Sequence, residues 1–266
     1  MKKVRNYSLI VGLVITGLML LIAAAGLFWT PYSTTGMSLG LKFAPPSAGH
    51  IFGCDNYGRD IFSRVMEGIG TTFLVSAVTI AFGMVVGSAI GLTAGYVGGW
   101  FDEIIMRIND VLNAFPSILL ALVFVSFLGP GLMNIILALG ILFVPSFARI
   151  ARGEMLRLKS LPFVQSARLS KAGPIRIIFA HILPNAYINI LASAAVGFNN
   201  AVIAEAGLSF LGLGVQPPNA SLGRMINEAG NYLLQAPWYA IFPGVTIIVL
   251  VLGVALISDG ISQINA

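Results

Sequence analysis

Few residues in this sequence have the type and spacing that chemistry requires. His50 and Cys54 lie four residues apart and Asp55 follows directly, so an imidazole, a thiol and a carboxylate could be imagined as ligands of one metal ion. The surrounding segment is rich in Gly and Pro, so this spacing does not place them on one helix face. An ordinary loop is the favoured interpretation. We predict no metal site, although contact of His50 and Cys54 with a metal stays open.

Motifs for nucleotide binding and hydrolysis are absent from the sequence. It contains no GxxxxGK[ST] phosphate loop, no HExxH, no CxxC and no nucleophile elbow. A membrane enzyme would need a catalytic constellation, and none is visible. We therefore expect no catalytic residue and no cofactor on this chain.

The most informative pattern is a basic segment between two apolar runs. Charged residues are missing from 111 to 148 and, apart from His181, from 177 to 204. Between these runs lie Arg149, Arg152, Arg157, Lys159, Arg168, Lys171 and Arg176. Apolar flanks of this length bury themselves in lipid and hold the basic segment at the membrane surface. The pattern therefore predicts a helical docking element on that side of the membrane.

Composition also places the chain in a membrane. Hydrophobic residues make up 57% of the 266 residues and charged residues 9%, whereas soluble domains have roughly 45–50% and about 25%. So little charge excludes a water-soluble fold. The formal charge of +5 follows membrane topology and does not indicate nucleic-acid binding.

The apolar runs predict an all-α polytopic membrane protein with about six transmembrane helices. These are expected at 8–29, 72–96, 111–129, 132–148, 186–205 and 239–258. The chain then divides into three parts. Residues 1–69 form the first transmembrane helix and an outer loop, residues 70–260 form a five-helix core with a cytoplasmic loop at 149–185, and residues 261–266 form a short cytoplasmic tail. With both termini cytoplasmic, the outer side holds only four of the 15 Lys and Arg residues, namely Lys42, Arg59, Arg64 and Arg224.

Two features within the spans have alternative interpretations. Gly83, Gly87, Gly91 and Gly95 recur every four residues, so they form a smooth stripe that admits another helix closely. The stripe could serve packing within the chain, or a contact between subunits or along a pathway. Glu205 could point into a water-filled pathway, or reach the interface or cap a neighbouring helix.

Three blocks of sequence resemble the permeases of ABC importers. Their EAA loop has the pattern EAA, a glycine four residues later, then I-LP, and here Gln165-Ser166-Ala167 and Ile182-Leu183-Pro184 stand at its two ends. Residues 52–68, FGCDNYGRDIFSRVMEG, resemble the outer GTDxxGRDxxSR motif of the dipeptide, oligopeptide and nickel permeases. Residues 207–218, GLSFLGLGVQPP, match the C-terminal half of that subfamily.

The sequence departs from the family pattern at several positions. Gln165 and Ser166 replace the glutamate and alanine, which removes the usual acidic contact, and Lys171 replaces the glycine. In the outer motif, Cys54 replaces threonine and Gly70 stands where arginine is common. Whether Gln165 and Lys171 alter coupling stays open.

The resemblance implies a multi-pass permease subunit of an ATP-driven importer in the bacterial cytoplasmic (inner) membrane. Its expected partners are a second homologous permease, in a heterodimer, two ATP-binding subunits and an extracytoplasmic substrate-binding protein. ATP and Mg would be bound by the ATPase partner, and nucleic acid is not expected. A stand-alone channel or carrier is a more distant alternative. The lack of a visible inverted repeat is evidence against it.

The resemblance also implies roles for particular residues. A short coupling helix at 163–171 would begin after Pro162 and end at Gly173-Pro174. The expected ATPase-coupling residues are Phe163, Val164, Gln165, Ser166, Ala167, Arg168, Leu169, Ser170, Lys171 and Gly173. Docking of the binding protein, or an outer gate, is expected of Asp55, Arg59, Asp60 and Arg64, although Arg59 and Asp60 could equally pair within the loop.

The cargo is read from two short runs that disagree. Residues 167–173, ARLSKAG, are similar to the nickel-type permeases, whereas residues 203–207, IAEAG, look more like the peptide branch. We expect nickel or a metal chelate as cargo, with dipeptides or oligopeptides as the alternative.

Overall fold

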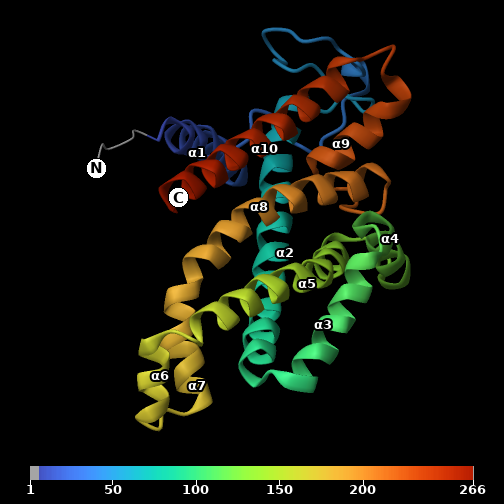
Figure 1. Cartoon of the computed structure of the whole chain (residues 1–266). Coiled ribbons are helices and arrows are strands. Elements are labelled where there is room, and N and C mark those ends of the chain that lie inside the picture. The colour runs from blue at the N-terminus through green and yellow to red at the C-terminus, as the bar shows by residue number, and fades with distance from the viewer. Residues whose placement is uncertain (1–5, 266) are drawn as a thin grey trace.

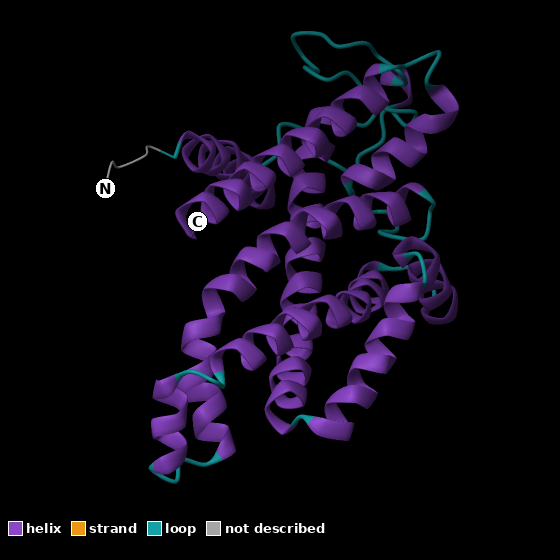
Figure 2. Cartoon of the chain, in the orientation of Figure 1, coloured by secondary structure: helices purple, strands orange, loops and turns teal. Residues whose placement is uncertain are grey.

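The computed structural model describes residues 6–265, and every regular element in that range is helical (Figures 1 and 2). In chain order the elements are α1 (Tyr7–Phe28), η1 (Leu39–Leu41), α2 (Ile61–Val97), α3 (Gly99–Ala114), α4 (Ser117–Leu128), α5 (Leu132–Leu158), α6 (Pro162–Leu169), α7 (Pro174–Arg176), η2 (Ile177–Ile182), α8 (Leu183–Phe210), α9 (Leu222–Ala229), η3 (Gly230–Tyr232) and α10 (Trp238–Asn265). Five helical segments of the described chain are long and apolar enough to cross a membrane, or six if α3 and α4 form one bent span. The expected all-α polytopic fold is confirmed.

The third span differs from the straight helix expected at 111–129. It begins at Gly99, and its two halves, α3 and α4, meet at a bend of 94°. Pro116 causes the break, because its ring cannot donate a backbone hydrogen bond and it pushes the preceding residue out of the helical region. Phe115 accordingly has an extended backbone, with φ −90° and ψ 142°. Hydropathy reports the length of an apolar run but not its direction.

Several other helices extend beyond the apolar runs that predicted them. α2 starts at Ile61 rather than 72, because the Asp60 carboxylate caps it by accepting a hydrogen bond from the Ser63 N–H at 2.7 Å. α5 continues past 148, α8 covers more than 186–205, and α10 continues past 258. The loop between α1 and α2 therefore ends at residue 60, and much of the expected cytoplasmic loop at 149–185 is helix. Polar and charged residues at these ends shortened the predicted spans.

The glycine stripe of α2 packs against α5 within the same chain. A Cβ on Gly91 would overlap the carbonyl oxygen of Ala148, and one on Gly87 would lie 2.5 Å from another α5 backbone oxygen. Gly83 and Gly95 face side chains of that helix. Such small residues let two helix backbones approach closely where lipid supplies no hydrophobic driving force. In this structure the stripe therefore serves intrachain packing.

The two ends of α2 mark the two sides of the molecule. Its N-terminal end lies with the loop of residues 29–60 and with α9, and its C-terminal end lies towards α6 and α7 (Figure 1). At the other edge of the fold, the Asn6 side chain donates a hydrogen bond to the Gly260 carbonyl at 2.6 Å, which ties the start of α1 to the end of α10. This arrangement is consistent with an even number of crossings.

The packing of α2 on α5 can be tested with an added methyl group. We expect Gly91→Ala to lower the free energy of unfolding by roughly 1–3 kcal/mol, because the new Cβ must displace backbone. Thermal unfolding in detergent would measure it. Gly153→Ala is the matched control, since nothing lies within 4 Å of a Cβ there. Equal stability of the two variants would contradict the close approach.

Candidate functional site

A short helical hairpin, α6 followed by α7, projects from the end of the fold (Figure 1). Pro162 occupies the first turn of α6, where its missing N–H costs nothing. Val164 is buried in a cluster with Ile177 and Ile182 of the following segment η2, and Ala167 is also buried. The hairpin is thus packed against η2, which leads into α8. The helix ends at Leu169, two residues before the predicted boundary.

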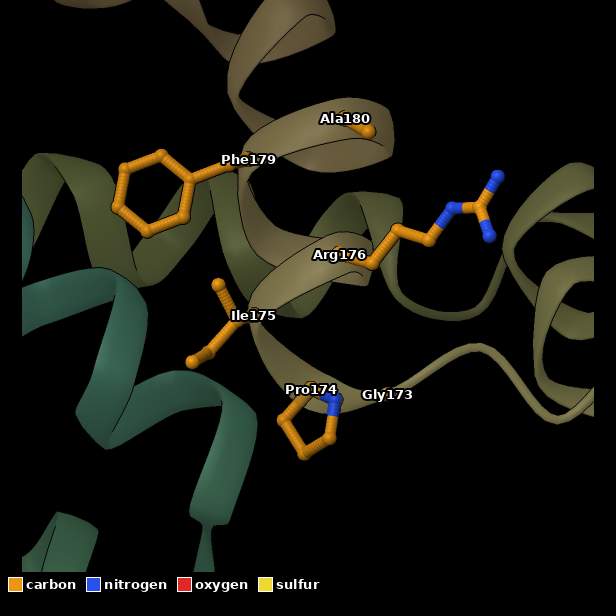
Figure 3. A pocket seen from close by; sticks show the side chains of 6 residues that line it. All are labelled: Gly173, Pro174, Ile175, Arg176, Phe179 and Ala180. Carbon is orange, nitrogen blue, oxygen red and sulfur yellow. The ribbon is translucent and has the colours of Figure 1, made fainter.

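The outer face of this hairpin combines apolar and cationic side chains. Leu169 is 86% exposed and Ile175 is 75% exposed. Ile175, Arg176 and Phe179 line an open pocket, and Ile175 and Phe179 point to one side of the helix while Arg176 points to the other (Figure 3). Apolar side chains this exposed next to a basic surface are typical of a contact with another protein.

Three contacts tie the hairpin and the end of α5 to neighbouring helices. The Lys159 ammonium group donates a hydrogen bond to the Gly95 carbonyl of α2 at 2.8 Å, next to the C-terminus of that helix. The Arg168 guanidinium lies 5.4 Å from the centre of the Tyr96 ring. Arg152 of α5 forms a two-pronged ion pair with Asp102 of α3, with both N–O distances 2.6 Å. Movement of the hairpin would therefore be passed directly to α2.

The backbone conformation at residue 171 explains why the family has a glycine at this position. Lys171 has a φ of +56°, in the left-handed region that favours glycine, and it stands at the position of the family glycine. The turn needs this conformation because the Lys171 and Ala172 N–H groups bond back to carbonyls of α6 at 2.9 and 3.0 Å. The Gln165 amide donates to the Ser160 carbonyl at 3.0 Å, so the residue in place of the family glutamate caps its own turn.

A second candidate site is a cleft lined by α3, α4, α5 and α8. It has a volume of about 520 Å³, and its wall contains both apolar and polar surface. Four polar side chains interrupt that wall: Asn113, Ser117, Ser146 and Asn200. All four are exposed at positions flanked by apolar helix. Amides and hydroxyls facing hydrocarbon would be costly, so this face is suited to a water-filled space.

The sequence prediction missed this cleft. The available signal was the pair of amides, Asn113 and Asn200, that interrupt runs otherwise free of charge. Glu205, which the sequence offered for a pathway, is fully buried next to the cleft and does not line it. Its carboxylate accepts a hydrogen bond from the Ser209 hydroxyl at 2.7 Å. In this structure Glu205 therefore lies neither in the wall of the cleft nor on the exposed surface.

A buried charge network joins the outer loop to three helices. The Asp55 carboxylate pairs with Arg59 at 2.6 Å and with Arg64 at 2.7 Å. Glu228 of α9 pairs with the same two arginines at 3.1 and 3.0 Å, and accepts a hydrogen bond from the Tyr239 hydroxyl at 2.8 Å. Burial raises the pKa of Glu228, but Arg64, Tyr239 and Arg59 together lower it below its ordinary value. The carboxylate is therefore ionised at neutral pH.

The structure corrects one pairing in this loop. Arg59 contacts Asp55 and Glu228 rather than Asp60. Asp60 caps α2 and contacts the His50 ring at 2.9 Å. Asp55, Arg59, Asp60 and Arg64 are all buried, and their contacts hold the outer loop together. Their expected role in docking of the binding protein, or in an outer gate, stays a prediction.

The side chains of His50 and Cys54 are not arranged as ligands of one metal ion. His50 contacts Asp60, and Cys54 is fully buried. Burial, with Asp60 and Asp55 nearby, raises the pKa of the Cys54 thiol to about 11, which keeps it protonated. Within residues 6–265, no three His, Cys, Asp or Glu side chains are grouped so that they could hold a metal ion.

Comparison with known proteins gives consistent matches over most of the chain. Residues 87–265 match the family model described as binding-protein-dependent transport system inner membrane component. The dipeptide transport system permease protein DppC of Alkalihalophilus pseudofirmus is 39% identical over 257 residues, covering 97% of this chain and 84% of the relative. The glutathione transport system permease protein GsiD of Pectobacterium atrosepticum is 41% identical over 253 residues, covering 93% and 84%.

Among solved structures, the chain is similar in fold to a subunit of the inward-facing MetNI methionine ABC transporter. The TM-score is 0.63 at 20% identity, over 76% of this chain and 96% of that chain. A likeness at this identity concerns the fold alone.

The strain at Lys171 is testable by local stability. We expect Lys171→Gly to stabilise the hairpin by about 1 kcal/mol, because glycine adopts positive φ without a Cβ clash. Exchange of the Ala172 amide hydrogen would then slow roughly five-fold. Lys171→Ala removes the same charge but keeps a Cβ, so it should show no such gain. Equal slowing in both variants would point to charge instead of backbone strain.

Proposed function

Because the chain belongs to the family of binding-protein-dependent transport system inner membrane components, we propose that it is the peptide-translocating permease of an ATP-driven importer. The family membership makes it a multi-pass inner membrane protein whose ATPase activity resides on partner subunits. It also replaces the stand-alone channel or carrier that the sequence left as a distant alternative.

The chemistry of the cleft carries the choice of cargo. Its lining contains no His, Cys, Asp or Glu, the side chains that hold a nickel ion most firmly. Instead it offers the amides of Asn113 and Asn200 and the hydroxyls of Ser117 and Ser146. These groups both donate and accept, as the peptide backbone does. The cleft therefore suits a short peptide better than a metal ion.

The relatives support the same cargo and correct our first expectation. Their names specify dipeptide and glutathione transport, and not nickel. The nickel expectation came from residues 167–173, which lie in the α6–α7 hairpin and do not line the cleft. Similarity in a coupling segment says little about what passes through the pathway. The peptide alternative is the better supported reading.

The hairpin would be the contact with the ATPase. Its buried side chain Val164 packs it against η2, and its exposed apolar face is left for a partner. When nucleotide closes the partner ATPases, the hairpin would act as a lever on α2 through Lys159 and Gly95. Alternating access then needs two packings of these helices separated by a few kcal/mol.

The other partners follow from the incomplete cleft. In this chain alone the cleft between α3, α4, α5 and α8 is partly open. A second homologous permease, in a heterodimer, would close the cleft. Two ATPase subunits would bind on the cytoplasmic side, and a substrate-binding protein would bind on the outer side.

The coupling role is tested by charging the exposed face of the hairpin. We expect Leu169→Asp to abolish co-purification of the ATPase subunits and to lower ATP-driven uptake at least about ten-fold, because a desolvated charge at an interface costs several kcal/mol. Leu234→Asp is the matched control, since Leu234 is fully exposed at the opposite end. It should keep the ATPase bound.

Membrane insertion of both variants must be equal for the comparison to count. Normal ATPase binding and uptake by Leu169→Asp would remove the hairpin from the coupling path. Loss of ATPase binding in both variants would show that the effect is not specific to the hairpin.

The cargo assignment is tested in the cleft. We expect Asn200→Leu to lower the maximal rate of dipeptide uptake up to about ten-fold, because one hydrogen-bonding group along the pathway is lost at similar volume. Ile203→Leu, in the same wall, should leave the rate near wild type. Uptake of a labelled dipeptide and of nickel salt in proteoliposomes would measure it. Nickel uptake by the wild type, without dipeptide uptake, would refute the peptide assignment.

A further inference from the structure

Three arginines meet at the outer end of the fold with only two carboxylates. Arg59 and Arg64 share Asp55 and Glu228, and Arg224 of α9 pairs with the second Glu228 oxygen at 3.2 Å. In the described part of the chain, no further carboxylate lies within ion-pair distance of these guanidinium groups. The network therefore keeps one positive charge in excess.

This excess charge borders a pocket between the outer loop and α9. The pocket has a volume of about 330 Å³, and its lining residues include Arg59, Arg224, Asn227, Asn231 and Glu228, whose carboxylate is already counted in the balance of the network. The terminal nitrogens of Arg224 and the Asn231 amide have no hydrogen-bond partner among residues 6–265. Glu228 accepts a hydrogen bond only from the Nε of Arg224. The two terminal nitrogens of Arg224 are therefore available as donors at the pocket wall.

The donors suit a carboxylate. A guanidinium group presents a planar fork that matches two carboxylate oxygens, and neighbouring amide N–H groups can complete the shell. The Tyr57 ring, also in the pocket wall, lies 4.7 Å from the Arg59 guanidinium and holds it in place. A single excess positive charge balances one carboxylate, whereas a phosphate would bring nearly twice that charge.

The position of the pocket indicates where the carboxylate comes from. None of its lining residues lines the cleft of α3, α4, α5 and α8. A peptide on its way through the cleft would therefore not occupy it. The occupant must be something that rests on the outer side of the membrane while cargo is delivered.

We propose that this pocket receives an acidic side chain of the extracytoplasmic substrate-binding protein when that protein docks. This inference rests on the proposed importer function. The buried network of Asp55, Arg59, Arg64 and Glu228 would then be the rigid support of the pocket, and Arg224, which is partly exposed, would make the contact. The acidic side chain would complete the charge balance of the network.

The proposal is tested by the concentration of binding protein needed to stimulate the reconstituted importer. We expect Arg224→Glu to raise the half-maximal concentration about ten-fold or more, with the loss in apparent affinity and not in the maximal rate. Lys42→Glu is the matched control, because Lys42 is an exposed outer cation that does not line the pocket. It should leave the half-maximal concentration within about two-fold of wild type.

A charge exchange identifies the partner residue. Acidic residues on the docking face of the binding protein are changed to Arg one at a time, and one of them should restore stimulation of the Arg224→Glu importer. An unchanged half-maximal concentration in Arg224→Glu, or equal effects of Arg224→Glu and Lys42→Glu, would overturn the proposal. So would a change in KM confined to peptides with a free C-terminal carboxylate, because the occupant would then be cargo.

Failure of the importer function itself is distinguishable. A wild-type complex that no binding protein stimulates would refute the proposed function and this inference together. Normal stimulation of the wild type with an indifferent Arg224→Glu variant would refute the inference alone.

Discussion

The close approach of α2 to α5 is the contact on which the rest of the structure depends. At Gly87 and Gly91 the two backbones come so near that a single methyl group would not fit. Lipid offers no hydrophobic drive for helices to associate, so shape and dispersion must hold them. Since α5 leads directly into the hairpin and α2 leads back to the outer loop, this one seam fixes both functional ends relative to one another.

The length of α2 allows this contact with α5 to connect the two ends of the molecule. Its 37 residues form a rod of about 55 Å. At one end Arg64 belongs to the buried charge network, and at the other Gly95 and Tyr96 contact Lys159 and Arg168 of the segment around the hairpin. If the outer side docks a binding protein and the hairpin acts as a lever, this rigid helix would let each side respond to the state of the other without a flexible relay.

Much of this could be predicted from the sequence, and the failures have physical causes. Hydropathy located the helices because crossing a bilayer needs an apolar run of fixed length, and the short helix after Pro162 was expected from the resemblance to the EAA loop. The bend at Pro116 was missed because an apolar run carries no direction. The pairing of Arg59 with Glu228 joins residues 169 positions apart, so no local pattern could indicate it. The polar cleft needed four separate segments to come together before its amides had a common neighbour.

The bend between α3 and α4 also places bare backbone beside the cleft. A helix that stops at Ala114 leaves carbonyl oxygens of its last turn without partners in the same helix, and residues on both sides of the bend line the cleft. Non-helical backbone at such depth is tolerated only where protein or water surrounds it. Backbone carbonyl groups, and not side chains alone, would then contact the amide groups of the proposed peptide cargo. Divergent relatives could exchange most side chains here and still conduct the same class of solute.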